Sequence, residues 1–365
     1  MACRRAVCIV VTASLFVGCG EAPIEPEVTF QAATSLAGPP IVSTSERIPL
    51  PPPPGYTFPH PRHVNRHGQV AGTAVALNPR RDVGVLWERG TPIELPGLPG
   101  NPLGNPAAIN DAGQILGAVA PAGGGLGVSV VWENGTVTSL SDLTGNDLFI
   151  GADINNAGWI AGSLGVSPRV AALWAEGQVT VLPTPAGYGN TFGSRVGGGL
   201  ILGETSRLVG NPSGPPTQES AFVIWDRDGS ILWTEDNHPR PFPGGTERWV
   251  GITRKGDAYI KNTGVGALWR WRDGELAPWP NPNDPGAANA MAVSPSGLVL
   301  GGLMENSAYT TLGVWKGKRF YAFDDQDMWC IDISDKYVLC GQGDRRSFTI
   351  LDPFIAKLAF DDEQE

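Results

Sequence analysis

A short unit with two glycine turns recurs along the chain, and its clearest copy spans residues 107–140. In Asn110-Asp111-Ala112-Gly113, Asn stands at the first position and Gly at the fourth, as a type I turn prefers. A second turn, Glu133-Asn134-Gly135, follows an apolar stretch that ends at Trp132. Two glycine turns between apolar stretches predict two β-hairpins, so each unit should hold four short strands.

Seven copies keep this order. The fourth position of the first turn falls at residues 68, 113, 158, 199, 256, 297 and 337, so the spacings run from 40 to 57 residues. Six copies carry the tryptophan, and the seventh has Leu351 in its place. Four strands in roughly 40–50 residues are typical of a propeller blade, and propellers have about 4–8 blades. We therefore predict an all-β fold, a seven-bladed β-propeller of four-stranded blades; a sandwich or a β-solenoid of the same hairpins is the alternative.

Composition excludes some functions. The 365-residue chain has 49 glycines and 33 prolines, which suits a fold with many turns. Its formal net charge is −10 and no basic stripe is present, so we expect no nucleic-acid partner. The sequence holds no Gly-x-Ser-x-Gly, His-Glu-x-x-His or phosphate-cradling motif, so we expect no enzyme of those classes and no cofactor.

The N-terminus predicts export. Arg4 and Arg5 precede a short apolar stretch at residues 6–17, as in a signal peptide. The stretch ends in Leu15-Phe16-Val17-Gly18-Cys19, which resembles the lipobox of bacterial lipoproteins. The resemblance implies cleavage after residue 18 and lipid attachment at Cys19, which would anchor the protein in a membrane. Gly20, rather than Asp, implies the outer membrane or cell surface of a Gram-negative bacterium. The alternative is a plain secretory signal.

These features divide the chain into four segments. Residues 1–18 are the predicted lipoprotein signal peptide, and residues 19–44, rich in Pro, Glu, Ser and Thr, are a predicted disordered tether. Residues 45–360 should form the propeller, and residues 361–365 an acidic tail.

The start of the propeller segment offers a way to close the ring. Residues 46–50 are similar to residues 91–97, a predicted fourth strand, but no first three strands precede them. Residues 348–351 and 356–360 are candidates for the last two strands of the seventh blade. We predict that residues 46–50 pair with that blade, because an open ring would leave exposed strand edges.

The consensus Ile-Asn-x-x-Gly-x-Ile-x-Gly, followed by Val-x-Trp-x-x-Gly, resembles the HAF-type extracellular repeat of bacterial proteins, over about residues 60–352. That resemblance implies an exported, propeller-like protein, and it implies no particular reaction. The repeated Asn65, Asn110 and Asn155 and the six tryptophans match positions of the family, and we interpret them as turn and packing residues.

Two stretches contain metal-ligand types. His60, His63 and His67 lie within eight residues, but no helix aligns them, so solvated histidines are favoured over a zinc site. The segment 226–230, Asp-Arg-Asp-Gly-Ser, is similar to part of a calcium loop, but it lacks the distal ligands, and a hairpin turn explains it. We expect no bound metal.

Cys330 and Cys340 are the only cysteines beyond the N-terminal 19 residues, and they fall on the two strands of the last first-to-second hairpin. Simple pairing across residues 334–337 sets Cys330 opposite Gly341, and a bulged turn sets it opposite Gln342. In an exported protein a disulfide between the two cysteines is possible, with two buried thiols as the alternative.

The fourth copy is the longest, because it contains insertions at residues 204–220 and 234–248. Extra loops on a repeat scaffold often carry recognition, and aromatic and arginine side chains often dominate binding. The candidate binding residues in and beside the second insertion are Trp233, His238, Arg240, Phe242 and Trp249. The alternative is that these loops pack on the propeller.

The sequence therefore predicts a lipid-anchored cell-envelope propeller that presents a recognition surface to a protein or carbohydrate partner. A hydrolase or lyase acting on a polysaccharide through carboxylates at the central channel is a second hypothesis. A structural envelope component is the third.

Overall fold

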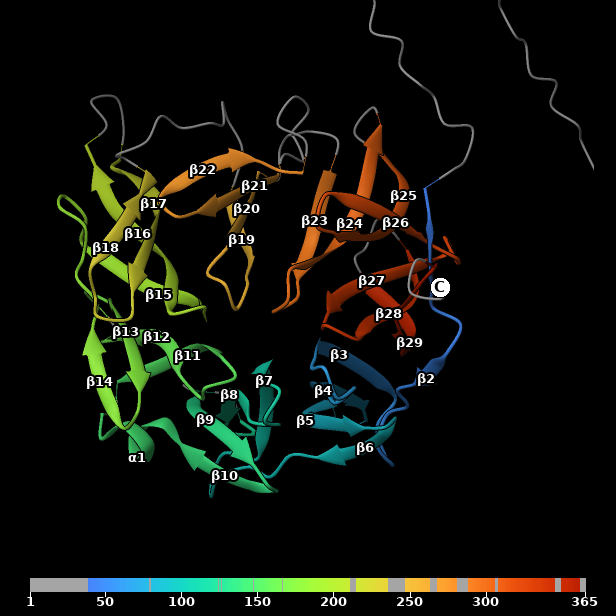
Figure 1. Ribbon diagram of the computed structural model, residues 1–365. Helices are drawn as coiled ribbons and strands as arrows, with labels where there is room; N and C mark the ends of the chain where they lie inside the picture. Colours follow the sequence, from blue (N-terminus) through green and yellow to red (C-terminus); the bar gives the residue numbers. More distant parts are fainter. Residues whose placement is uncertain are drawn as a thin grey trace, which may run out of the picture. The chain divides into compact units, whose positions relative to one another are not determined.

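A computed structural model describes residues 39–361 of the chain, except for gaps at 79, 124, 126, 147, 166, 211–214, 236–246, 263–267, 281–287, 306–307 and 345–348. The unit that begins at Pro39 contains seven sheets, which surround a common centre in Figure 1. The seventh sheet packs against the first, so the ring is closed. The predicted seven-bladed β-propeller is confirmed.

Each blade is an antiparallel sheet whose first strand lies next to the centre. Blade 1 consists of β3 (Phe58–Val64), β4 (Val70–Leu77), β5 (Arg80–Glu88) and β6 (Thr91–Glu94). Blade 2 consists of β7 (Leu103–Ile109), β8 (Ile115–Ala120), β9 (Val128–Glu133) and β10 (Thr136–Ser139). Blade 3 consists of β11 (Phe149–Ile154), β12 (Ile160–Leu164), β13 (Val170–Ala175) and β14 (Gln178–Val181). Blade 4 consists of β15 (Asn190–Gly197), β16 (Leu200–Val209), β17 (Thr217–Asp226) and β18 (Ile231–Thr234).

The remaining blades follow the same order. Blade 5 consists of β19 (Glu247–Ile252), β20 (Ala258–Asn262), β21 (Leu268–Arg272) and β22 (Glu275–Pro278). Blade 6 starts with β23 (Ala288–Val293), β24 (Leu298–Glu305), β25 (Ala308–Lys316) and β26 (Arg319–Phe323). Blade 7 starts with β27 (Met328–Ile333), β28 (Tyr337–Asp344) and β29 (Thr349–Lys357). A short helix, α1 (Leu140–Thr144), links blades 2 and 3. Among the described residues, no helix has the length and apolar character needed to cross a bilayer.

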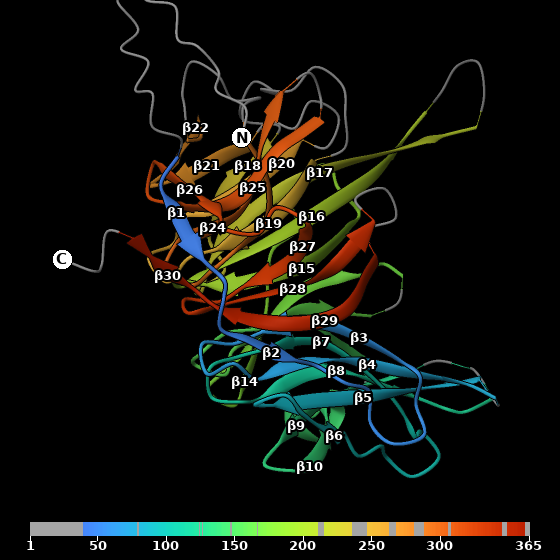
Figure 2. The ribbon, with the colours of Figure 1, turned by 90° about the vertical axis from the view of Figure 1, so that its right-hand side faces the viewer.

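The two ends of the ring differ. The turns between first and second strands and between third and fourth strands all lie at one end, which we call the turn face; it is the side viewed in Figure 1. The opposite end, the loop face, carries the long hairpins that project to the right in Figure 2. The insertion predicted at residues 204–220 lengthens one of them, because β16 and β17 pair from Leu200 with Asp226 out to Val209 with Thr217.

Strands from the N-terminal side complete the last two blades. The predicted fourth strand of blade 7 is β2 (Arg47–Pro49), which pairs with β29 through Ile48 opposite Ile355. A second strand, β1 (Ile41–Ser43), pairs parallel with β26 and antiparallel with β30 (Ala359–Phe360), so blade 6 is extended to six strands. We call residues 39–50 together with 322–325 and 353–360 the closing seam.

Two boundaries predicted from the sequence are corrected. Residues 41–44 were assigned to the disordered tether, but Val42 and Thr44 are fully buried in the seam, so the folded part begins earlier than residue 45. Residues 348–351 and 356–360 were expected to form two separate strands of blade 7. Instead, β29 is one continuous strand of that blade, and β30 pairs with β1. The burial of Val42 among blade 6 residues decides the first point, because no repeat of the turn or tryptophan pattern marks this short apolar segment in the sequence.

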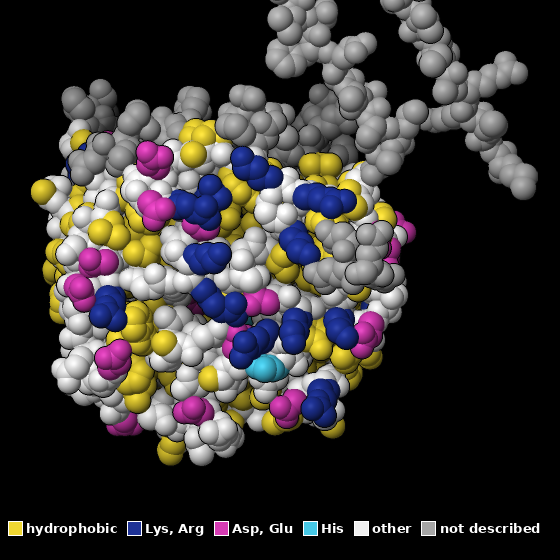
Figure 3. Space-filling view, viewed as in Figure 1, with side chains coloured by type: hydrophobic (Ala, Val, Ile, Leu, Met, Phe, Trp, Pro, Cys, Tyr) yellow, Lys and Arg dark blue, Asp and Glu magenta, His cyan; other side chains and the backbone are white. Residues whose placement is uncertain are grey.

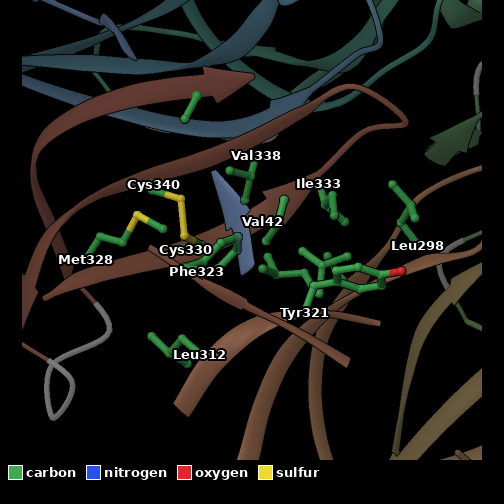
Figure 4. Close-up of a cluster of buried hydrophobic side chains, with 14 of the residues drawn as sticks. Val42, Leu298, Leu312, Tyr321, Phe323, Met328, Cys330, Ile333, Val338 and Cys340 are labelled. Atoms are coloured by element: carbon green, nitrogen blue, oxygen red, sulfur yellow. A yellow bond between two sulfur atoms is a disulfide. The ribbon is translucent and has the colours of Figure 1, made fainter. Parts of the chain in front are cut away.

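The cysteine pair packs against the seam. Cys330 stands opposite Cys340 and is joined to it by a disulfide, with a Cα–Cα distance of 3.9 Å. Neither register considered from the sequence is found, because β27 carries its bulge between Cys330 and Asp332, rather than in the turn. Figure 4 shows the disulfide in a cluster of buried side chains from β1, β26, β27 and β28, among them Val42 and Phe323.

The repeated tryptophan packs between blades, as predicted. Trp87, Trp132 and Trp225 are buried, and each indole donates a hydrogen bond to a proline carbonyl at the end of the preceding fourth strand, 2.6–2.9 Å away. Trp87 and Trp132 pair with the second-strand residue that lies two positions after the first turn. In blade 7 that residue is Leu339, and its partner is Ile355. Leu351, which we had aligned with the tryptophans, is exposed, so that assignment was wrong.

Candidate functional site

Each innermost strand is interrupted at the same level. The register of every first strand shifts by one residue against its second strand, so one bulged residue lies next to the central channel. The bulged residues are Arg62, Ala107, Ala152, Ser194, Val250, Met291 and Ile331. The repeated glycine of the second strand fits this bulge: a Cβ at Gly117 would lie 2.4 Å from the carbonyl oxygen of Asn105.

A cavity of about 590 Å³ occupies the channel between these bulges and the turn face. First-strand and turn residues of all seven blades line it. Its wall combines the apolar side chains of Val250, Met291 and Ile331 with charged groups, which include Arg62 and Arg195. An apolar wall with a few polar groups is typical of a site for a small ligand. Figure 3 shows Lys and Arg side chains gathered around the middle of this face.

An ionic network spans the mouth of the cavity. The Arg254 guanidinium of blade 5 lies 3.3 Å from a carboxylate oxygen of Asp111 in blade 2 and 2.6 Å from one of Asp335 in blade 7. Arg66 and Asn156, from blades 1 and 3, also contact Asp111, and the Ser296 amide of blade 6 donates to Asp335. Six blades are thus linked across the mouth.

Blade 4, which takes no part in the network described above, has a turn of three glycines, Gly197 to Gly199. A Cβ at Gly198 would lie 2.4 Å from the backbone nitrogen of Gly256 in the next blade. Gly198 also has a φ of +57°, which favours glycine. At this turn, blade 4 therefore approaches blade 5 through its backbone.

Two carboxylates lie in the cavity wall. Asp153 accepts a hydrogen bond from the Val196 amide of the next blade at 3.0 Å, and Asp332 accepts one from the Val64 amide at 2.9 Å. Burial raises the pKa of Asp153, and the nearby Arg195 guanidinium and the Val196 amide only partly oppose the rise. Asp153 is half-buried and lines the cavity. These two carboxylates thus link adjacent innermost strands as well as facing the cavity.

The repeated asparagines form what we call the asparagine ladder: Asn65, Asn110 and Asn155. Each side-chain oxygen accepts backbone amides within its own turn. The Asn65 amide donates to the Asn110 carbonyl at 3.0 Å, and the Asn110 amide donates to the Asn155 carbonyl at 2.9 Å. The turn role that we predicted is therefore found, and two of the side chains also join consecutive blades.

The predicted recognition cluster beside the second insertion is not a surface in the described part of the chain. Trp233 and Trp249 are 3% and 8% exposed and pack in the core between blades 4 and 5, and the Trp249 indole donates to the Gly203 carbonyl. Their assignment as binding residues was therefore wrong, because the fourth strand and the next first strand both turn these rings inward. His238, Arg240 and Phe242 lie outside the described residues.

The three histidines do not converge. His60 and His63 lie on β3, and His67 lies in the turn that follows it. His60 and His67 are exposed, and His63 is 3.7 Å from the Asp332 carboxylate. Over the described residues, no group of three or more His, Cys, Asp or Glu side chains has a geometry that could hold a metal ion. Residues 226–230 form a hairpin turn in which the Asp226 carboxylate accepts the amides of Asp228 and Ser230.

The charged residues that line the cavity were not predicted from the sequence. Arg62, Asp153, Arg195, Arg254 and Asp332 come from different blades, and no linear motif links them. One signal was available: Asp153 and Asp332 each stand two residues before the first residue of a repeated turn. That position follows the bulge, so a charged residue there borders the channel.

No family model matches the chain, and no curated protein matches it. Solved structures do. The β-propeller domain of the trilobed protease from Pyrococcus furiosus, described as having an open velcro topology, is 12% identical with a TM-score of 0.53, over 84% of this chain and 97% of that one. A catalytically inactive virginiamycin B lyase from Staphylococcus aureus, with quinupristin, is 14% identical with a TM-score of 0.49, over 86% and 98%. At such identities the likeness shows the propeller fold alone.

Proposed function

We propose that this protein is an exported, lipid-anchored propeller that binds a protein or carbohydrate partner at the cell envelope. The binding site is the turn-face cavity, rather than the insertions favoured by the sequence. The observation that carries this proposal is the cavity itself, with about 590 Å³ and both apolar and charged groups in its wall. Small-ligand pockets usually measure roughly 300–1,000 Å³. A sugar unit or one side chain of a protein loop would fit.

The anchoring part of the proposal is supported by the leader and by Cys19. Two or more acyl chains on Cys19 would hold the protein on a membrane. Residues 20–38 would then separate the propeller from the lipid. The test is metabolic labelling with an alkyne fatty acid followed by membrane fractionation. Label on the wild type and none on Cys19→Ser supports the anchor; release of an unlabelled wild-type protein into the medium contradicts it.

The binding part is tested with the Cys19→Ser chain on arrays of envelope glycans and purified envelope proteins. Any ligand that binds should be lost when the cavity is filled by Met291→Trp, and weakened by Ile331→Phe if the first variant folds poorly. Leu208→Ser on the projecting hairpin is the matched control, because Leu208 is 74% exposed and lies at the loop-face end of β16. Loss with Leu208→Ser and full binding with Met291→Trp would move the site to the loop face.

One observation favours the hydrolase or lyase hypothesis as a second candidate. Burial raises the pKa of Asp153, and a carboxyl group with a raised pKa is suited to general-acid catalysis. Release of reducing or unsaturated ends from an envelope polysaccharide, abolished by Asp153→Asn, would establish an enzyme. A protein that binds nothing, but whose deletion weakens the envelope, would instead be a structural component.

A further inference from the structure

The charged side chains around the turn-face cavity differ in how many protein partners they have. Its carboxylates all have protein partners: Asp153 and Asp332 accept backbone amides of the next blade, and Asp111 contacts Arg66, Asn156 and Arg254. Buried or half-buried anions with such partners need no ligand.

Two of the arginines that line the cavity differ from Arg254. Arg195 donates one hydrogen bond, to the carbonyl of its own neighbour Ser194, and Arg62 makes no hydrogen bond or ion pair to any described residue. Arg195 is near Asp153 and influences the pKa of that carboxyl, but within the described ranges no carboxylate oxygen lies within 4 Å of its guanidinium. Most of the donors of these two guanidinium groups are therefore left to solvent or a ligand.

The repeat shows that the fold does not require arginine at either place. At the bulge, where blade 1 has Arg62, blades 5, 6 and 7 have Val250, Met291 and Ile331. At the next position, where blade 4 has Arg195, the equivalent residues of blades 2, 5 and 6 are small: Ala108, Gly251 and Ala292. The second place holds His63, Asp153 and Asp332 in blades 1, 3 and 7, so neither place requires a guanidinium for the fold.

We propose that the turn-face cavity binds a ligand that carries a compact oxyanion, a carboxylate or a phosphate, through Arg62 and Arg195. The planar guanidinium presents paired N–H donors that match such groups. The remainder of the ligand lies against Val250, Met291 and Ile331. This proposal rests on the proposed function, since it names the chemistry recognised by the same site.

The probes are glucuronate, glucose 6-phosphate and glucose, which share a ring and differ in charge, with acetate and inorganic phosphate as minimal anions. Binding to the mature Cys19→Ser chain is measured by isothermal titration and by NMR of arginine side chains. We expect at least one anion to bind and glucose to bind at least about tenfold more weakly. Arg62→Gln and Arg195→Gln should each weaken the anion roughly tenfold or more. The two sugar anions distinguish carboxylate from phosphate.

Arg89→Gln is the matched control, because Arg89 is exposed in the outer turn of blade 1 and does not line the cavity. Arg62→Lys and Arg195→Lys keep the charge and serve if a glutamine variant unfolds; they should give intermediate affinities. The inference is overturned if no anion binds, if glucose binds equally, or if Arg62→Gln and Arg195→Gln behave like Arg89→Gln. If a neutral ligand from the array binds the wild type and not Met291→Trp, the cavity is still the binding site, and only the oxyanion inference is contradicted. If the ligands from the array bind Met291→Trp as well as the wild type, the proposed function of the cavity is contradicted.

Discussion

The closing seam and the asparagine ladder both join neighbouring blades, but they do so by different means. In the ladder, an amide of one turn reaches the carbonyl of the next turn, 45 residues further along the chain. In the seam, strands from residues 41–49 pair with strands from residues 322–360, more than 270 residues away. The ladder repeats a local rule, whereas the seam is a single non-local event that buries Val42 and Leu50. We therefore expect the ring to depend most on the contact that occurs once.

Deletion of residues 39–50 should have the largest effect on stability. It removes β1 and β2, exposes the edges of blades 6 and 7, and uncovers the apolar cluster around Val42. We expect a loss of roughly 4 kcal/mol or more in the free energy of unfolding, measured in urea. Deletion of residues 20–38 is the control and should change nothing. An unaltered transition midpoint for the first deletion would mean that the seam does not hold the ring closed.

Removal of the disulfide should have the next largest effect. Cys330→Ala with Cys340→Ala opens a link across ten residues of the hairpin that packs against the seam, which should cost about 2–3 kcal/mol. Calorimetry of the double variant, and of the wild type with and without reductant, checks this. Reductant should lower the midpoint of the wild type and leave that of the double variant unmoved; equal midpoints for all samples would contradict the expectation.

One break in the ladder should cost less than the loss of a seam strand. In Asn110→Ala the side-chain contacts to its own turn and to the Asn155 carbonyl are lost in a nearly buried site. We expect about 1–3 kcal/mol by urea unfolding, with a similar value for Asn65→Ala. Ser334→Ala is the matched comparison in blade 7, because that buried hydroxyl accepts the Tyr337 amide of its own turn. If Ser334→Ala costs as much as Asn110→Ala, the bond between blades contributes little.

Acid should weaken the seam before the ladder. Burial of Asp324 would raise its pKa, but hydrogen bonds from Thr44 and Ser43 outweigh it and hold the pKa below the ordinary 3.8; the Arg47 hydrogen bond lowers the pKa of Asp325. Because both folded pKa values are depressed, the unfolded chain takes up protons first. The stabilisation is complete above about pH 4 and is lost as the pH falls through the folded values.

The measurement is urea stability between about pH 6 and pH 3 for the wild type, Asp324→Asn and Asn110→Ala. Asp324→Asn should show a smaller loss on acidification than the wild type, since one titrating group of the seam is gone. Asn110→Ala should lose stability by the same amount at every pH, because the amide does not titrate. If the stability of Asp324→Asn and of the wild type falls equally with pH, Asp324 does not cause the acid sensitivity of the seam.

Most of the fold was predictable because each blade repeats the same local chemistry. The two glycine turns and the tryptophan predicted the strand order. Residues 46–50 predicted how the ring closes, because they resemble a fourth strand without the first three strands of a blade before it. The register errors in blade 7 arose where that signal fades: Leu351 was aligned in place of Ile355 because no tryptophan marks the position. The disulfide between Cys330 and Cys340 is present, but both strand registers considered for Cys330 were wrong, because the bulge of β27 cannot be seen in the sequence.

The candidate site was far less predictable. Trp233 and Trp249 have the composition of a binding cluster, and only their packing between two blades shows that they belong to the core. The cavity, in contrast, is assembled from single residues of seven blades, such as Arg62 and Arg195, which have no neighbours in the sequence that would mark them.

By itself, the sequence determined the kind of sheet module, the number of modules and the means of closing the ring, because turns and strand patterns are local properties of the chain. The tertiary structure alone decided which residues face the channel, which aromatic rings are buried and where the two cysteines meet. Those outcomes depend on bulges, on the registers between strands and on the packing of blades, and each of these brings together residues that are distant in the sequence.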